Sequence, residues 1–177
     1  THLVRVWEMS TFDMLPNNIA EPQEPFPTIY WDLSYRRQFL IEPVAPDFWD
    51  EYGSLPLDAW DYEYGLTTRS VYSPPLLLPQ ALVVRYAGRS MGLAALPVFY
   101  LTRLVGLLAY LVLVWAAVRL VPYGKWLFAL LAVSPVAILQ AATISADSIS
   151  NGIAFLFIAG VLAIAQHEEI DWKKWWG

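Results

Sequence analysis

Cysteine is absent from this chain of 177 residues, and histidine occurs only twice. Without cysteine, the chain can form neither disulfides nor thiolate metal sites. His2 and His167 fall on opposite sides of the membrane predicted below, so a histidine metal site is not expected. No cofactor is evident from the other residues, and they do not decide whether a divalent metal is required.

Basic side chains are also scarce. Lysine and arginine total 11 against 16 acidic residues, which gives a formal net charge of −5. Nucleic acid is therefore excluded as a partner, because binding its phosphates requires a basic face. The sequence has no Gly-rich phosphate loop and no nucleophile elbow, so two common signatures of nucleotide binding and hydrolysis are missing.

A signal peptide is missing as well, since no charged segment with an apolar core precedes the polar stretch. Thr1 stands where an initiator methionine would be. We therefore expect a fragment of a longer membrane protein whose N-terminal spanning helix came before Thr1. The missing helices of that full-length protein would be partners of this chain, together with the lipid bilayer.

Apolar residues, by contrast, are in excess. They form 57% of the chain, whereas soluble domains contain about 45–50%. Residues 1–90 carry 12 of the 16 acidic side chains, and only four charged residues occur between Met91 and Gln166. The chain thus combines a polar, acidic half, residues 1–90, with an apolar half.

Three segments of the apolar half have the roughly 20 mainly apolar residues that a spanning helix needs. They cover about 96–120, 126–143 and 149–165, and Pro135 lies inside the second. A soluble bundle of unusually oily helices is the alternative, but such helices show a polar stripe with a period of 3.6 residues. Residues 107–118 contain no such stripe. We predict an all-α membrane protein with about three transmembrane helices.

Basic residues near helix ends set the predicted orientation, because they favour the cytoplasmic side. Cations lie in the link 119–125 and in the tail 167–177, and none lies in the link 144–148. We predict a multi-pass protein of the cell membrane with 119–125 and 167–177 in the cytoplasm. Residues 1–91 and 144–148 are then extracytoplasmic. Five tryptophans lie near the predicted helix ends, as interfacial anchors do, namely Trp115, Trp126, Trp172, Trp175 and Trp176.

The extracytoplasmic first-loop region, 1–91, divides into three parts. Residues 1–14 are mildly helical, and 16–65 are rich in proline, acidic and aromatic residues, which predicts an irregular loop with short turns. Residues 75–89 are apolar but short. We interpret them as an interfacial helix that lies along the outer membrane surface, with Arg85 and Arg89 on one face. A short buried core helix is the alternative.

Arg103 is a cation inside the outer part of the first predicted span. Placing arginine in hydrocarbon costs roughly 3 kcal/mol on insertion scales, so its position requires an explanation. One explanation is that the side chain snorkels to the lipid headgroups. A second is that it faces a cavity and holds an anionic headgroup. A third is a structural pair with a buried carboxylate.

A cluster of polar residues lies between the second and third predicted spans. It contains Gln140, Thr143, Ser145, Asp147, Ser148 and Asn151. Asp147 would complement the dipole at the start of the third helix, and Ser145 could cap its free amides. The alternative is that this cluster lines the mouth of a substrate cavity. Pro135 is expected to kink the second helix and to free a carbonyl nearby.

Two further groups in the acidic half could carry chemistry. His2 and Arg5 share one face of the expected first helix, either as part of a site or as a solvated surface pair. Carboxylates that could act as a general base are Asp50, Glu51, Asp58, Asp61 and Glu63. Acidic loops of this kind are usually just solvated, so these carboxylates are weak candidates.

Four runs of the sequence resemble one known family. They are YSPPLLLPQA at 72–81, FYLTR at 99–103, GKWLFALLAVSP at 124–135 and QAATISAD at 140–147. Together they resemble the bacterial and archaeal membrane family called domain of unknown function 2142. The resemblance is close over 72–166 and loose over 1–15, and residues 16–70 match nothing that we can name.

That family is itself similar to the GT-C glycosyltransferases, multi-pass enzymes that take a sugar from a polyprenyl phosphate. The resemblance implies a partner of that kind and a role in the assembly of surface polysaccharide or glycolipid. In the family the first loop opens with an acidic pair followed by histidine and arginine, which His2 and Arg5 would match. The pair itself would precede Thr1, so the catalytic residues are expected outside this fragment.

The substrate-binding residues implied by the resemblance and by the polar cluster are His2, Arg5, Tyr72, Gln80, Arg103, Gln140, Ser145 and Asp147. Arg103 would hold the lipid phosphate, and loop aromatics such as Trp31, Trp49 or Trp60 would stack on sugar faces. A membrane transporter or scaffold for polysaccharide precursors, without catalysis, is the alternative function. A plain structural anchor is a third reading, which leaves Arg103 and the polar cluster unexplained.

Overall fold

The computed structural model describes residues 2–10, 25–27, 50, 53–57, 62–64 and 73–166. In the first half, α1 (His2–Met9) is a helix, which agrees with the helical prediction for 1–14. Strand β1 (Pro25–Pro27) pairs antiparallel with β2 (Tyr62–Tyr64). Most of the predicted loop 16–65, and the whole tail 167–177, lie outside the described residues.

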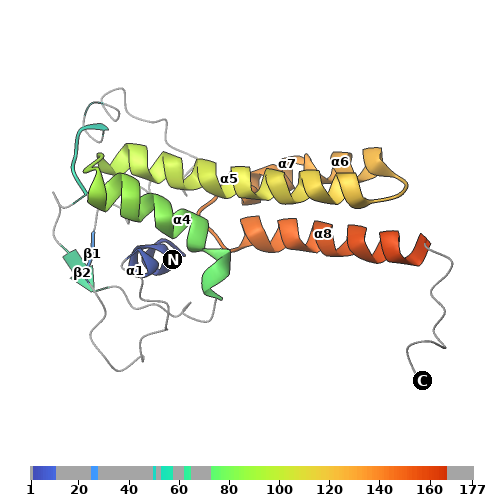
Figure 1. The fold of residues 1–177 in the computed structure, drawn as a ribbon. Helices are drawn as coiled ribbons and strands as arrows, with labels where there is room; N and C mark the ends of the chain where they lie inside the picture. The colour runs from blue at the N-terminus through green and yellow to red at the C-terminus, as the bar shows by residue number, and fades with distance from the viewer. Residues whose placement is uncertain are drawn as a thin grey trace, which may run out of the picture.

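The second half is helical throughout. It contains the 3₁₀ turn η1 (Pro74–Leu76), α4 (Leu78–Val83), the π-helix η2 (Val84–Ser90), α5 (Ala95–Leu120), α6 (Lys125–Ala132), α7 (Pro135–Ala141) and α8 (Asp147–Gln166). Figure 1 shows α5 as the longest element, with α6 and α7 along one side of it and α8 beside its second half.

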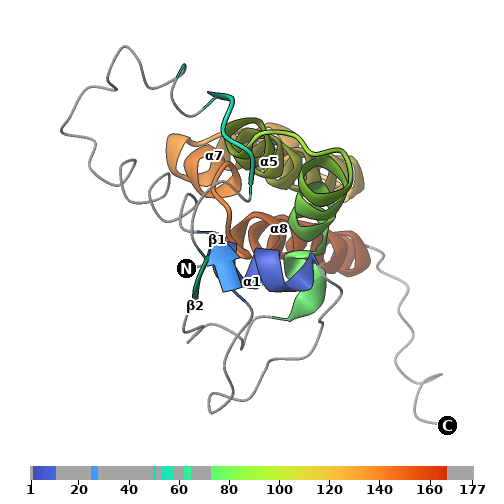
Figure 2. The same cartoon turned by 90° about the vertical axis from the view of Figure 1, so that its left-hand side faces the viewer.

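Helices α5 and α8 pack side by side and run in the same direction, as Figures 1 and 2 show from two sides. Their close approaches advance together along both helices. Ser148 lies at Gly106, Gly152 at Leu113 and Gly160 at Leu120. The chain must therefore return between them, and α6 with α7 makes that return. This order corresponds to three passes between the same two ends of the bundle.

The first two turns of α5 extend beyond the start of α8. They pack into a hydrophobic cluster with α1, α4 and η2 instead of with the other long helix. The buried members of the cluster from these elements include Leu3, Val6, Trp7, Met9, Ala81, Val84, Ala95, Leu96, Val98 and Phe99. Residues 95–102 therefore belong to this cluster, and the exposed apolar side chains of α5 follow it along the helix.

The predicted helix at 75–89 is present as α4 followed by η2, but it does not stand apart on a surface. Both figures show it running back alongside the first part of α5. Gln80, Ala81, Val84 and Gly88 are buried in this packing. The face with Leu78, Leu82 and Tyr86 is only partly covered, and Tyr86 is 56% exposed, so the interfacial helix and the buried core helix both stay predictions.

The predicted second span, 126–143, is not one continuous helix. It is divided into α6 and α7 at Val133 and Ser134. Proline has no N–H to donate and disfavours helical geometry in the residue before it, and Ser134 accordingly has φ −57° and ψ 145°. Pro135 therefore begins a new helix, where the expectation was a kink inside one helix.

The break frees the carbonyl of Ala132, as expected near Pro135, and α5 supplies its partner. The fully buried hydroxyl of Tyr110 donates to this oxygen at 2.8 Å, and no backbone amide of the described residues does so. In lipid, a backbone group without a hydrogen bond costs several kcal/mol, so a break is tolerated only where protein supplies a partner.

Two helices of the described part, α5 and α8, are long and apolar enough to cross a membrane, with mean hydropathies of 2.1 and 2.0. In α8 only 17% of the apolar window is buried, unlike the core helix of a soluble protein. Trp126 on α6 is 90% exposed and has exposed leucines around it. The prediction of an all-α membrane protein is confirmed, and the predicted second span stays a prediction, because α6 and α7 are two short helices.

The Gly152→Ala change should loosen the α5–α8 pair. A Cβ at residue 152 would lie 2.7 Å from Leu113 Cδ1 and 2.9 Å from its Cβ, so α5 must shift. Overpacking of this kind lowers the free energy of unfolding by about 1–3 kcal/mol. Gly160→Ala is the matched control, because its Cβ would meet Leu120 at an ordinary 3.8 Å. Equal melting temperatures of the two variants in detergent would contradict the packing.

Removing the Tyr110 hydroxyl should lower the stability of the protein, because the break between α6 and α7 then has an unbonded carbonyl. Tyr110→Phe keeps the ring and leaves the Ala132 carbonyl without its donor, so the free energy of unfolding should fall by about 1 kcal/mol. Tyr123→Phe serves as the control because Tyr123 is exposed beyond the end of α5. The melting temperatures of both variants are measured in lipid nanodiscs. An unchanged melting temperature of Tyr110→Phe would contradict the role of this hydrogen bond.

Candidate functional site

Two predicted site residues from different elements meet at the turn between α7 and α8. Arg103 on α5 donates from Nε to the carbonyl of Ala142 at 2.6 Å. Gln80 on α4 donates from Nε2 to the next carbonyl, that of Thr143, at 3.5 Å. These carbonyls follow the end of α7, where helix carbonyls have no partner within the helix. The turn at 142–148 is therefore the point where α4, α5, α7 and α8 converge.

Gln80 reaches this turn through a notch in the surface of α5, the space that Gly106 leaves because it has no side chain. The side chain is only 1% exposed, and a Cβ at residue 106 would lie 2.6 Å from its Nε2. The Ala141 carbonyl and the Ser148 hydroxyl lie 3.5 Å from the same position. Glycine is needed here because any side chain would displace the amide. Among the described residues, no group donates to Gln80 Oε1.

Arg103 carries a positive charge that the described residues do not neutralise. Its guanidinium lies 5.8 Å from the centre of the Phe99 ring, and its one hydrogen bond goes to a neutral carbonyl. No carboxylate of the described part forms an ion pair with it, which removes the explanation of a structural pair within that part. The side chain is half-buried at the end where α8 begins. A cation held in this way can bind an anion at the membrane boundary.

Ser145 and Asp147 form the cap that the sequence suggested as the structural alternative. The Ser145 hydroxyl accepts from the Asp147 amide at 3.0 Å and donates to the Asp147 carboxylate at 2.6 Å. Ser145 is buried, whereas Asp147 is exposed in the first turn of α8. The geometry thus explains both residues by helix capping and dipole stabilisation. A contact with substrate stays a prediction for them.

Gln140 and Asn151 link α7 to α8 next to the same turn. Asn151 Nδ2 donates to Gln140 Oε1 at 3.1 Å. The Thr143 hydroxyl donates to the Gln140 carbonyl at 2.7 Å, which stabilises the end of α7. Gln140 is exposed, so its amide is accessible at the surface of the bundle.

Arg5 is carried by the N-terminal helix. It is 1% exposed on α1, so the alternative of a solvated surface pair is wrong for Arg5. The side chain of His2 and the whole of Tyr72 lie outside the described residues, so their predicted roles stay predictions. Arg85 and Arg89, predicted to share a face, both donate to Ser10 at the end of α1, and Arg89 also stacks on Trp7 at 3.9 Å.

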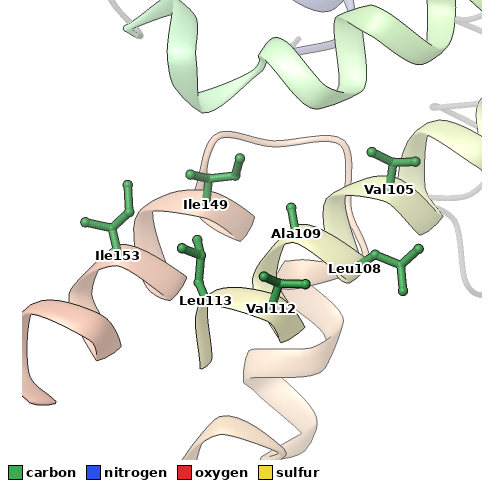
Figure 3. A pocket seen from close by; sticks show the side chains of 7 residues that line it. All are labelled: Val105, Leu108, Ala109, Val112, Leu113, Ile149 and Ile153. Carbon is green, nitrogen blue, oxygen red and sulfur yellow. The ribbon is translucent and has the colours of Figure 1, made fainter. Parts of the chain in front are cut away.

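An apolar groove of 480 Å³ lies between α5 and α8. Figure 3 shows the seven aliphatic side chains that line it, which are Val105, Leu108, Ala109, Val112, Leu113, Ile149 and Ile153. None of them can donate or accept a hydrogen bond, so the groove can contact hydrocarbon but cannot select a ligand. Groups of three or more potential metal ligands do not occur within the described residues.

Gln80, Arg103, Gln140, Ser145 and Asp147 are thus brought to one turn, as the polar cluster predicted for most of them. Two residues that complete the arrangement were missed, Gly106 and Tyr110. Gly106 could have been found from its sequence position, because it is a small residue one turn after Arg103. Tyr110 could have been found because its hydroxyl is a polar group in an otherwise apolar segment, next in sequence to a segment that contains a proline.

Comparison with known proteins gives one match. The model of a family described as "Predicted membrane protein (DUF2142)" matches residues 1–176. No curated protein matches the chain, and no solved structure does.

A double-mutant cycle tests the notch between Gln80 and Gly106. Gly106→Ala alone should displace the buried amide and lower the free energy of unfolding by about 1–2 kcal/mol. In Gln80→Ala/Gly106→Ala the added methyl has room, so the loss should be smaller than the sum of the single changes by about 1 kcal/mol. Strict additivity of the melting shifts in nanodiscs would show that the two residues do not touch.

Proposed function

The chain belongs to the DUF2142 family of predicted membrane proteins, and from that premise we propose that it is part of a GT-C-like membrane glycosyltransferase. The enzyme would transfer a sugar from a polyprenyl phosphate during the assembly of cell-surface polysaccharide or glycolipid. The reaction would take place at the extracytoplasmic face. Residues 1–91 would lie on that face, and 119–125 and 167–177 would lie in the cytoplasm.

The observation that carries this proposal is the guanidinium of Arg103. It has no carboxylate partner in the described part of the chain, and its Nε is fixed on the Ala142 carbonyl at the end of the bundle where α8 begins. A lipid phosphate is the anion that a bilayer presents at this depth. A cation held by protein binds such a group better than a mobile one, because it loses less freedom on binding.

In the proposed reaction, the hydroxyl of an acceptor attacks the sugar carbon and the bond to the lipid phosphate breaks. Arg103 would stabilise the negative charge that develops on the leaving phosphate. An acidic residue would accept the proton of the hydroxyl. That residue would belong to the acidic pair that the resemblance implies ahead of His2 and Arg5, and these two would act as helpers.

The break between α6 and α7 supports a second candidate, a transporter or scaffold for polysaccharide precursors. Helices interrupted inside the membrane are a feature of secondary transporters, where substrate sites form near the break. Here, however, the freed carbonyl is already bonded by Tyr110, and the polar groups gather at the end of the bundle. These features favour the enzyme.

The test compares Arg103 variants of the full-length protein in nanodiscs. With a panel of polyprenyl-phosphate sugars as donors, Arg103→Ala should lower kcat/KM by about 100-fold or more, because one charge-stabilising group is lost. Arg103→Lys should retain part of the activity. Arg119→Gln is the control, since Arg119 stacks on Trp115 at the opposite end of α5.

Unchanged transfer in Arg103→Ala would refute the assigned role. If no donor of the panel is turned over, but vesicles with the protein translocate the labelled lipid, the transporter replaces the enzyme.

A further inference from the structure

The two amides that join α7 to α8 leave matched hydrogen-bonding groups unused. Asn151 Nδ2 donates to Gln140 Oε1, so the pair retains the NH₂ of Gln140 and the carbonyl Oδ1 of Asn151. In the described residues neither group has a partner. If both amides were turned over, one NH₂ and one carbonyl would still remain. The pair therefore presents a donor beside an acceptor in either arrangement.

The couple and the unneutralised cation of Arg103 are both bonded to the same end of α7. Gln140 lies in its last turn, and the carbonyl that fixes Arg103 belongs to Ala142, two residues later. The Thr143 hydroxyl, bonded to the Gln140 carbonyl, stabilises the same short stretch. Gln140 is exposed and Asn151 is half-buried, so a ligand can reach the couple from the membrane boundary.

The chemistry of the couple selects among anionic lipids. A phosphate can only accept hydrogen bonds once it is ionised, and a hydrocarbon chain can do neither. A hydroxyl both donates and accepts, so two adjacent hydroxyls match an NH₂ beside a carbonyl. We propose that Gln140 and Asn151 bind the hydroxyl groups of a polyol whose phosphate is held by Arg103. The inference rests on the proposed function and specifies the substrate class at that site, a phosphodiester that carries a sugar or similar polyol.

A matched pair of lipids isolates the hydroxyl groups from the charge. Phosphatidylinositol and phosphatidylmethanol carry the same phosphodiester charge, but only the first has a polyol. The full-length protein is placed in phosphatidylcholine nanodiscs that contain equal amounts of both, and the lipids retained on the protein are counted by native mass spectrometry. The wild-type protein should retain phosphatidylinositol in preference, by roughly fivefold, as one or two hydrogen bonds between neutral groups allow.

Variants then assign the preference to the couple. Gln140→Ala and Asn151→Ala should each reduce the preference to about one while the total bound anionic lipid is kept. Arg103→Ala should reduce the binding of both lipids. Thr143→Val is the matched control, because it removes a hydrogen bond from the same turn without touching the couple. It should lower the melting temperature and leave the preference intact.

The outcomes separate this inference from the proposed function. Equal retention of the two lipids by the wild type, or an unchanged preference in both amide variants, overturns the polyol site while leaving Arg103 as an anion site. A preference that Thr143→Val abolishes as fully as Asn151→Ala also overturns it, because the pair then only ties α7 to α8. If Asn151→Ala does not assemble, Gln140→Ala decides, since it leaves α8 unchanged.

Discussion

The demand of backbone groups for hydrogen bonds in lipid is the constraint on which this structure depends. Between α6 and α7 a proline ends one helix and starts another, and a bilayer would offer no water to the freed carbonyl. Tyr110 on α5 supplies the missing donor at Ala132, and Arg103 on the same helix supplies another at Ala142. Helix α5 thus holds the end of α6 and the end of α7, and this fixes the turn that follows α7.

The position of the polar residues follows from that attachment. Because the turn is held against α5, Gln80 can reach it from α4 only through the space that Gly106 leaves. Gly152 gives α8 the same kind of close approach one step farther along. Close backbone approach at glycine is a common basis for packing between membrane helices, where burial of apolar surface gives little driving force. The polar cluster is therefore a consequence of packing as well as a candidate site.

The run of polar residues at 140–151 marked the turn between α7 and α8. Hydropathy was sufficient to predict the two long apolar helices, α5 and α8. It could not predict that 126–143 divides into two helices, because a proline inside an apolar run is compatible with a kink as well as a break. Whether the break is tolerated depends on a distant side chain, that of Tyr110. For 75–89, one face packs on α5 while Tyr86 on another is exposed, and an apolar pattern alone does not decide whether lipid or protein covers each face.

For Arg103, the sequence left three explanations open, and the part of the chain that the structure describes removes one of them, the carboxylate pair. For Arg5, burial excludes the solvated alternative without identifying a role. Tyr72 and the side chain of His2 are beyond the described residues, so sequence remains the basis for both. The distinction between an enzyme and a transporter depends on chemistry that neither periodicity nor packing encodes.

The part of α5 that extends beyond the start of α8 has a mechanical consequence. Its first two turns are continuous with the membrane pass and are clamped between α1, α4 and η2. A helix of this kind acts as a stiff lever, so any tilt that a thinner or thicker bilayer imposes on it moves the attached core as one piece. Local lipid thickness would thereby change the height and angle of that core relative to the bilayer.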